Sequence, residues 1–378
     1  MIKLGMVFYL VAGLVCNLAR AEAGVSANTV TLGQSIYLTG GLAALGNDLT
    51  TGAKLYFEHV NAQGGVHGRQ ILLETLDDAH NPARAKENAL TLLDSRNVFA
   101  LFQFAGTGSV TAVAPIADKK QVPLCAAVAT GPELRAKRFN QVFYVRAGNE
   151  QEINAITRHL ATIERKRFAV IYLDAPYGRQ GRAVAVQAAQ KNKLFYLVDA
   201  VINASVGDAK SVEKAVSLIA AQKPDGVLLV TAGKVTAELV RSLGRQGIRN
   251  DQIYALAAAL SASEIKALGP FAEGVVVSQV IPDPFSRSQP MVIDFNAALT
   301  KAGLKPNHAL LEGWINAAVC TSALKKSGPN LDRAGFVKAL ETMDDNFAGM
   351  RVRFDKLKHG RSDYVALTFG KDAGNYSK

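Results

Sequence analysis

Strand-length apolar runs alternate with longer amphipathic segments along most of this chain, and this alternation restricts its fold more than any other feature. Between residues 29 and 129 the strand-like runs are TVTLGQSIYL, QILLETLDD, VFALFQF and VPLCAAVA, separated by segments of helical periodicity. A strand, a helix and a second strand in this order form a parallel pair, because the helix returns the chain to the edge where the first strand began. This region therefore predicts a βαβαβ unit around a mainly parallel sheet.

The alternation resumes beyond residue 166 and predicts a second α/β unit. The strand-like runs are RFAVIYLD, KLFYLVDAVI, GVLLVTA and QIYALAA, and the predicted helices run from Gly181 onward and over 208–222, 235–247 and 261–269. Several of these runs are almost unbroken apolar sequences, which need helices on both faces of the sheet. We therefore expect two doubly wound, Rossmann-like α/β units.

The remaining C-terminal part is less regular. GVVVSQVIPDPF is typical of extended chain with two prolines, helices are predicted at 288–303, 308–327 and 331–343, and MRVRFDKLKHGRSDYVALTFG alternates like a hairpin around Lys358–Gly360. Helices and a terminal hairpin added to two α/β units indicate that the chain passes between the units more than once.

The N-terminus has the order of a secretory signal peptide. Lys3 precedes an apolar run at 4–18, and the small residues that follow, LARAEAG, contain an A-x-A cleavage pattern. The apolar run is shorter than the about 18 residues from which a membrane-spanning helix is inferred. We expect residues 1–23 to be a signal peptide, cleaved after Ala21 or Ala23, and the mature protein to be exported.

The net charge limits the kinds of ligand or partner that the protein is expected to bind. The formal net charge is +11, and the basic surplus is spread along the chain without a basic run, which argues against a nucleic-acid surface and favours at most a mild preference for anionic ligands. Cys125 and Cys320 lie in a predicted strand and a predicted helix. Export permits a disulfide between them, but their spacing requires none, so we predict two buried thiols.

No motif of an enzyme is present. The six histidines have no metal-ligand spacing, and the chain has no G-x-S-x-G nucleophile turn. Asp77, Asp78 and His80 come nearest to a metal-binding group, but acidic residues also gather before a helix start such as Asn81–Pro82. We therefore predict neither catalysis nor a metal or cofactor site.

A glycine turn, Gly106-Thr107-Gly108-Ser109, follows the strand-like run VFALFQF. A dinucleotide fingerprint would need glycine at the position of Thr111, and no P-loop lysine follows. Two hydroxyls beside the free N–H groups of a helix start remain, and such groups bind anions.

Thr130 lies at the end of the next predicted strand, before a second glycine turn. The carboxyl ends of neighbouring parallel strands face one crevice, where open α/β folds bind their ligands. Hydroxyl and N–H groups from the two turns can together bind a carboxylate. Taken singly, Ser109 and Thr130 can also be ordinary helix caps.

The chain resembles the bacterial periplasmic receptors for branched-chain amino acids that supply ABC importers. The resemblance rests on the order and spacing of the stretch from Thr31 to Ala85 (TLGQSIYLTGG to NPARA), VATGPEL, APYGRQG and FAEGVVV, and it covers essentially the whole mature chain. It implies a type I periplasmic-binding-protein fold, in which three crossover segments join two α/β lobes around a ligand cleft. The implied lobes are 24–147 with 281–350 and 148–280 with 351–378, with crossovers near 147, 280 and 350.

Several ligand contacts of that family can be carried over to this sequence. The hydroxyl for the ligand carboxylate falls at Thr107, with Ser109 as the alternative one turn away. The second threonine falls at Thr130, beside the backbone of Val128 and Ala129. An aromatic residue of the second lobe, which closes on the ligand, falls at Tyr177.

Three departures from the family concern the ligand's other end. Ala257, Ala258 and Ala259 stand where a glutamate binds the ligand ammonium, and Ala232 and Leu45 replace two aromatic residues. A buried ammonium without a carboxylate partner costs several kcal/mol. Glu264, in the next predicted helix, is the only nearby substitute.

The resemblance implies an extracytoplasmic solute-binding protein of the periplasm, monomeric, that delivers a small carboxylate-bearing ligand to the permease of an ABC importer. The departures leave two ligand classes open, namely a branched-chain amino acid bound in another way and an amine-free aromatic or keto acid. A ligand-sensing receptor module of the same fold, an amide- or urea-type or regulatory sensor, is the alternative function, and an exported enzyme is the more distant alternative.

Overall fold

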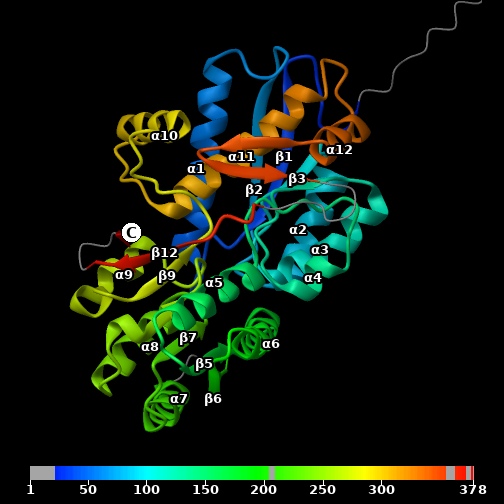
Figure 1. Ribbon diagram of the computed structural model, residues 1–378. Helices are drawn as coiled ribbons and strands as arrows, with labels where there is room; N and C mark the ends of the chain where they lie inside the picture. Colours follow the sequence, from blue (N-terminus) through cyan, green and yellow to red (C-terminus); the bar gives the residue numbers. More distant parts are fainter. Residues whose placement is uncertain (1–21, 204–208, 355–361, 372–375, 378) are drawn as a thin grey trace, which may run out of the picture.

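The computed structural model describes residues 22–203, 209–354, 362–371 and 376–377. Two sheets organise these residues, and each is covered by its own helices (Figure 1). Residues 1–21 of the expected signal peptide lie outside the described residues, as does the expected hairpin turn at Lys358–Gly360. None of the helices in the described part combines the length and apolar character needed to cross a membrane.

The first sheet has four parallel strands in the order β2-β1-β3-β4. They are β1 (Thr29–Ile36), β2 (Gln70–Asp77), β3 (Ala100–Phe102) and β4 (Leu124–Cys125). The helices after them are α1 (Ala43–Ala62), α2 (Pro82–Leu90, continued by a π-helical turn at Thr91–Ser95), α3 (Thr107–Lys120) and α4 (Pro132–Ala136). The predicted βαβαβ unit is confirmed, with buried apolar side chains on both faces of the sheet.

The second sheet has the strand order β13-β12-β9-β8-β7-β5-β6. Its parallel strands are β5 (Arg167–Leu173), β6 (Phe195–Ile202), β7 (Gly226–Val230), β8 (Ile253–Ala255) and β9 (Val276–Gln279). The helices are α5 (Asn149–Thr162), α6 (Pro176–Lys191), α7 (Ala209–Ala221), α8 (Lys234–Arg245) and α9 (Ala262–Leu268), with 3-10 turns at Asn250–Gln252 and Gly269–Ala272. The second doubly wound unit is therefore also confirmed. The helix α5 was not among the helices predicted from the sequence.

The C-terminal part divides between the two sheets. The helices α10 (Pro290–Lys301), α11 (His308–Lys326) and α12 (Arg333–Glu341) and the strands β10 (Asp344–Phe347) and β11 (Met350–Arg353) pack in the core of the first sheet. The strand β12 (Ala366–Gly370) lies beside β9 in the second sheet, and β13 (Tyr376–Ser377) follows it. Figure 1 shows α11 next to α1 and the red β12 next to β9.

The prediction that the strands on either side of Lys358–Gly360 pair with each other as a hairpin is wrong. The strand β11 pairs antiparallel with β10 through a two-residue turn at Ala348 and Gly349, both with positive φ, and β12 pairs with β9 instead. Alternating sequence predicts a strand with one buried face but does not identify its partner, which explains the error.

Close packing of α1 against α11 fixes the position of α11. A Cβ atom on Gly52 of α1 would lie 1.9 Å from the carbonyl oxygen of Leu310, and one on Gly313 of α11 would lie 2.0 Å from that of Leu49. Only glycine permits this approach of the two backbones. This contact also fixes the position of Glu312, a buried glutamate on α11.

Cys125 and Cys320 form a disulfide, so the prediction of two free thiols is wrong. The bond joins β4 to α11, with 6.3 Å between the two Cα atoms. This distance lies within the usual range for disulfides and results from the packing of α11 on the sheet. A sequence separation of 195 residues gives no indication of that proximity.

Candidate ligand-binding site

A cavity of about 80 Å³ lies between the two sheets, at the carboxyl ends of their strands. Residues that follow β1 to β4 line one side, and residues that follow β5, β7 and β8 line the other. They are Tyr37, Leu42, Leu45, His80, Gly106, Thr107, Val128, Thr130 and Arg146 on the first side and Leu173, Ala175, Tyr177, Ala232 and Ala258 on the second. This is the position at which open α/β sheets bind ligands.

Most of the residues expected from the sequence meet in this cavity, namely Thr107, Val128, Thr130, Tyr177, Leu45 and Ala232. Ala258 takes the place expected for Ala257, which lines a neighbouring cavity. Ser109 and Ala129 are buried but do not line either cavity. Glu264 caps its own helix, since its carboxylate accepts a 2.7 Å hydrogen bond from the backbone N–H of Ser261, and it lines neither cavity.

The two loops that carry the threonines are joined by a hydrogen bond. The helix α3 starts directly at Thr107, because Gly106 takes a positive φ of 97° and turns the chain into the helix. The hydroxyl oxygen of Thr107 accepts a 3.3 Å hydrogen bond from the N–H of Gly131, so its own proton stays available to an acceptor. The N–H groups in the first turn of α3 have no acceptor within the helix.

Arg146 is a site residue that the sequence analysis missed. It is 2% exposed, and its Nη1 atom donates to the two carboxylate oxygens of Glu312 at 3.2 and 3.4 Å. Its Nη2 atom lies 3.7 Å from Oε1 of Glu152, beyond hydrogen-bonding distance. In the described part of the chain, neither Nη2 nor Nε has a hydrogen-bond partner. A sequence signal did exist, since Arg146 interrupts the apolar run VFYVRAG.

Two buried carboxylates hold Arg146 in its charged form. Burial alone would lower the pKa of Arg146, but Glu312 and Glu152 outweigh it and raise that pKa. Glu152, on α5, also accepts from the N–H of Ala257 at 2.8 Å and from the hydroxyl of Ser278 at 2.6 Å. Burial raises the pKa of Glu312, opposed by Arg146. Neither glutamate lines the cavity itself.

Two tyrosines and a histidine complete the polar lining. Burial raises the pKa of Tyr37 and of Tyr177 above the ordinary tyrosine value, so both hydroxyls keep their protons and can donate. The hydroxyl of Tyr177 forms no hydrogen bond with any described residue. Burial lowers the pKa of His80, whose ring stands edge-on to Tyr37 with 5.4 Å between the ring centres. His80 is therefore a neutral group at pH 7.

Asp77 and Asp78 stabilise loops. Asp77 accepts from the N–H groups of Leu38 and Ala79, and Asp78 accepts from the N–H of His80 and the hydroxyl of Ser35. The side chain of Asn81 caps α2, and Pro82 is the first residue of that helix. The interpretation of this acidic stretch as a helix start is therefore confirmed.

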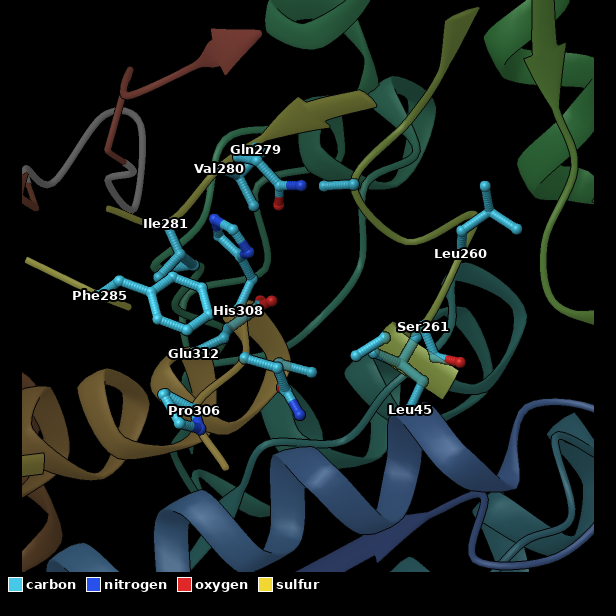
Figure 2. A pocket seen from close by; sticks show the side chains of 14 residues that line it. Leu45, Leu260, Ser261, Gln279, Val280, Ile281, Phe285, Pro306, His308 and Glu312 are labelled. Carbon is cyan, nitrogen blue, oxygen red and sulfur yellow. The ribbon is translucent and has the colours of Figure 1, made fainter. Parts of the chain in front are cut away.

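A smaller neighbouring cavity of about 30 Å³ shares Leu45 with the first one (Figure 2). Figure 2 shows His308 and Glu312 on α11 reaching toward the chain segment at Gln279–Ile281, with Leu45 of α1 on the opposite side. This cavity therefore lies where α11 meets the end of β9.

We predict that His308 makes the protein less stable in acid. Burial, opposed in part by Asp283, lowers the pKa of His308 from its ordinary value near 6.5 to about 4. A depressed histidine pKa contributes stability that is complete above pH 6.5 and is lost as the pH falls toward 4, by at most about 3 kcal/mol. The His308→Asn variant should lack this loss when urea unfolding is measured at several pH values. The exposed control His67→Asn should follow the wild type, and parallel curves for all three proteins would contradict the prediction.

The fold agrees with comparisons to known proteins. The profile of the periplasmic binding protein family matches residues 29–373. A relative, the Leu/Ile/Val-binding protein homolog 3 of Brucella melitensis, is 24% identical over 320 residues, which are 82% of this chain and 83% of that protein. An extracellular ligand-binding receptor from Verminephrobacter eiseniae has a TM-score of 0.84 and 26% identity, covering 93% of this chain and all of that chain. A solute-binding protein of an ABC transporter from R. palustris shares the fold, with a TM-score of 0.81 and 18% identity over 92% of this chain and 95% of that chain.

These matches cover nearly the whole described chain, and the proteins they name are binding proteins and receptors rather than enzymes. The high structural similarity over most of the chain agrees with its two α/β units. This chain belongs to the periplasmic binding proteins of the branched-chain amino-acid transporter family, with the type I fold.

Proposed function

We propose that this protein binds a small carboxylate that has no ammonium group and delivers it to the permease of an ABC importer. The observation that carries the proposal is the chemistry of the cavity. Its polar side chains can all donate hydrogen bonds, and among the described residues no aspartate or glutamate lines it. A site of hydrogen-bond donors fits an acceptor-rich anion.

The ligand carboxylate is placed at the two threonine loops. Thr107 and Thr130 both line the cavity, and the hydroxyl of Thr107 has a proton to donate. The α3 helix adds free N–H groups and the positive end of its dipole, which together favour an anion. Hydrogen bonds to a charged group contribute about 1.5–3 kcal/mol each, so this end of the cavity supplies much of the affinity.

We infer that the ligand has no ammonium group because the nearest carboxylates are engaged elsewhere and are not free to bind one. Glu264 caps α9, while Glu152 and Glu312 face Arg146. The other lining residues are apolar, which suits an aliphatic or aromatic body. The related protein from R. palustris was crystallised with benzoate, and another structural neighbour, from Thermomonospora curvata, is a fatty acid ABC transporter substrate-binding protein. Amine-free acids are therefore compatible with this fold.

Closure of the two halves would complete the site. We place the first lobe at 24–147 and 281–354 and the second at the remainder of the mature chain. The third crossover then lies beyond 350, because Val352 and Phe354 pack in the first core.

Tyr177 in the first turn of α6 would contact the ligand only in the closed form. The side chain of Gln180 donates to Glu133 at 3.1 Å and joins the two lobes. Contacts that exist only after closure shift the population toward the closed state.

A thermal-shift screen tests the ligand class. We expect leucine to change the melting temperature of the mature protein little, and at least one aromatic or keto acid to raise it by several degrees at concentrations far above its Kd. Amides and urea serve as uncharged controls and should have no effect. If leucine gives the largest shift, the alanines at 257–259 do not exclude an ammonium group and the proposed ligand class is wrong.

A further inference from the structure

One edge of the Arg146 side chain lacks a hydrogen-bond partner in the described part of the chain. Its Nη1 atom donates to Glu312, whereas Nε and Nη2 donate to no described residue although Arg146 is only 2% exposed. Glu152 lies 3.7 Å from Nη2, close enough for an ion pair but beyond hydrogen-bonding distance. Nε and Nη2 donate from the same edge of the planar guanidinium group, so one oxygen, or a pair of neighbouring oxygens, can accept from both. Buried donors are rarely left unpaired, and Arg146 lines the cavity.

Tyr177 offers a third unpaired donor from the opposite side. Its hydroxyl is buried and has no hydrogen-bond partner among the described residues. Tyr177 lines the same cavity as Arg146. The first and second sheets therefore each present an unpaired donor to this cavity.

The charge around Arg146 disfavours a carboxylate at that edge. The guanidinium carries one positive charge and already faces two carboxylates, Glu312 at 3.2 Å and Glu152 at 3.7 Å. A ligand carboxylate there would be a third negative group around one cation, and like charges in a buried site repel strongly. An uncharged oxygen uses the same donors without that repulsion.

We propose that Arg146 and Tyr177 bind a second, uncharged acceptor oxygen of the ligand, while the carboxylate lies at Thr107 and Thr130. Because Thr107, Thr130, Arg146 and Tyr177 all line one cavity, the two acceptors belong to one small molecule, and a 2-oxo acid carries such a pair on neighbouring carbon atoms. This inference rests on the proposed function and narrows its ligand class to carboxylic acids with a neighbouring carbonyl oxygen.

Matched pairs of acids test the inference. Ketoisocaproate and isocaproate differ only in the keto oxygen, as do phenylpyruvate and hydrocinnamate. In calorimetry on the wild type, the keto acid of at least one pair should have a Kd at least about tenfold lower than that of its partner acid. Tyr177→Phe should reduce this ratio, and Arg146→Met should bring it close to one. Tyr144→Phe is the control, because it removes another unpaired buried hydroxyl that does not line the cavity, and it should leave the ratio unchanged.

Removing the charge of Arg146 alone leaves two buried glutamates without a cation and can prevent folding. The triple variant Arg146→Met/Glu152→Gln/Glu312→Gln keeps the site neutral and should also bring the ratio close to one. Tyr177→Phe leaves all three charged side chains in place and should still reduce the ratio. Equal affinity for both acids of each pair in the wild type overturns the inference and leaves the proposed function standing. Equal loss of both acids in the Arg146 variants places the carboxylate on Arg146 and also overturns it. If no acid binds to the wild type, the proposed function itself fails.

Discussion

Replacing both Cys125 and Cys320 by alanine should lower the free energy of unfolding by about 5 kcal/mol. The disulfide closes a loop of 195 residues, and the chain-entropy estimate for a loop of that length is about 5 kcal/mol. Both sulfur-bearing side chains are fully buried, so the alanines also leave small cavities that add to the loss. The measurement is urea unfolding of the wild type and the double variant, followed by fluorescence of the buried Trp314.

Reductant provides the control for this prediction. Dithiothreitol should destabilise the wild type and leave the double variant unchanged, with a thiol assay on the unfolded protein confirming that the bond was reduced. The bond should also matter for ligand binding, because it ties β4, which precedes Val128 and Thr130, to α11, which carries Glu312. A fully reduced wild type with unchanged stability would contradict the expected role of the disulfide.

The double variant Thr107→Ala/Thr130→Ala should bind its best acid about a hundred to ten thousand times more weakly. Each hydroxyl donates one hydrogen bond to a charged carboxylate, which contributes about 1.5–3 kcal/mol, and a loss of 1.4 kcal/mol is a factor of ten. Calorimetry with the strongest acid of the thermal-shift screen gives the affinity. Circular dichroism should show a folded variant, because the hydroxyl of Thr107 supports only one weak internal hydrogen bond, 3.3 Å from Gly131.

Ser109→Ala is the matched control for the threonine variant. Ser109 lies on the same helix and is buried, but it does not line the cavity, so its loss should leave the affinity within about threefold. Unchanged binding in the threonine variant would refute the assigned carboxylate site. Weak binding in Ser109→Ala would move that site to Ser109, two residues along α3.

Much of the site could be predicted because it depends on local patterns. Alternation along the chain predicted the parallel strands of both sheets, and two neighbouring strands that end at the same edge bring Thr107 and Thr130 together. The family resemblance added Tyr177 and the replacement of larger residues by Leu45 and Ala232, which also line the cavity. These are features of single segments or of consecutive ones.

The parts that could not be predicted depend on contacts between distant segments. The charged group of Arg146, Glu152 and Glu312 joins α5 and α11 to the chain between the sheets, and no spacing in the sequence indicates it. The disulfide likewise depends on how α11 packs. The partner of β11 was misjudged because an alternating strand does not specify its neighbour. A charged residue inside an apolar run, as at Arg146, is the one usable signal among these.

The central claim is that the cavity binds a carboxylate and excludes an ammonium group. Calorimetric titration of one protein sample with leucine and with ketoisocaproate, and then with phenylalanine and phenylpyruvate, tests it most directly, since each pair shares its skeleton. In at least one pair the keto acid should bind, and in each pair it should bind more tightly than the amino acid. Tighter binding of leucine or phenylalanine would show that the cavity accepts an ammonium group, and would contradict the claim.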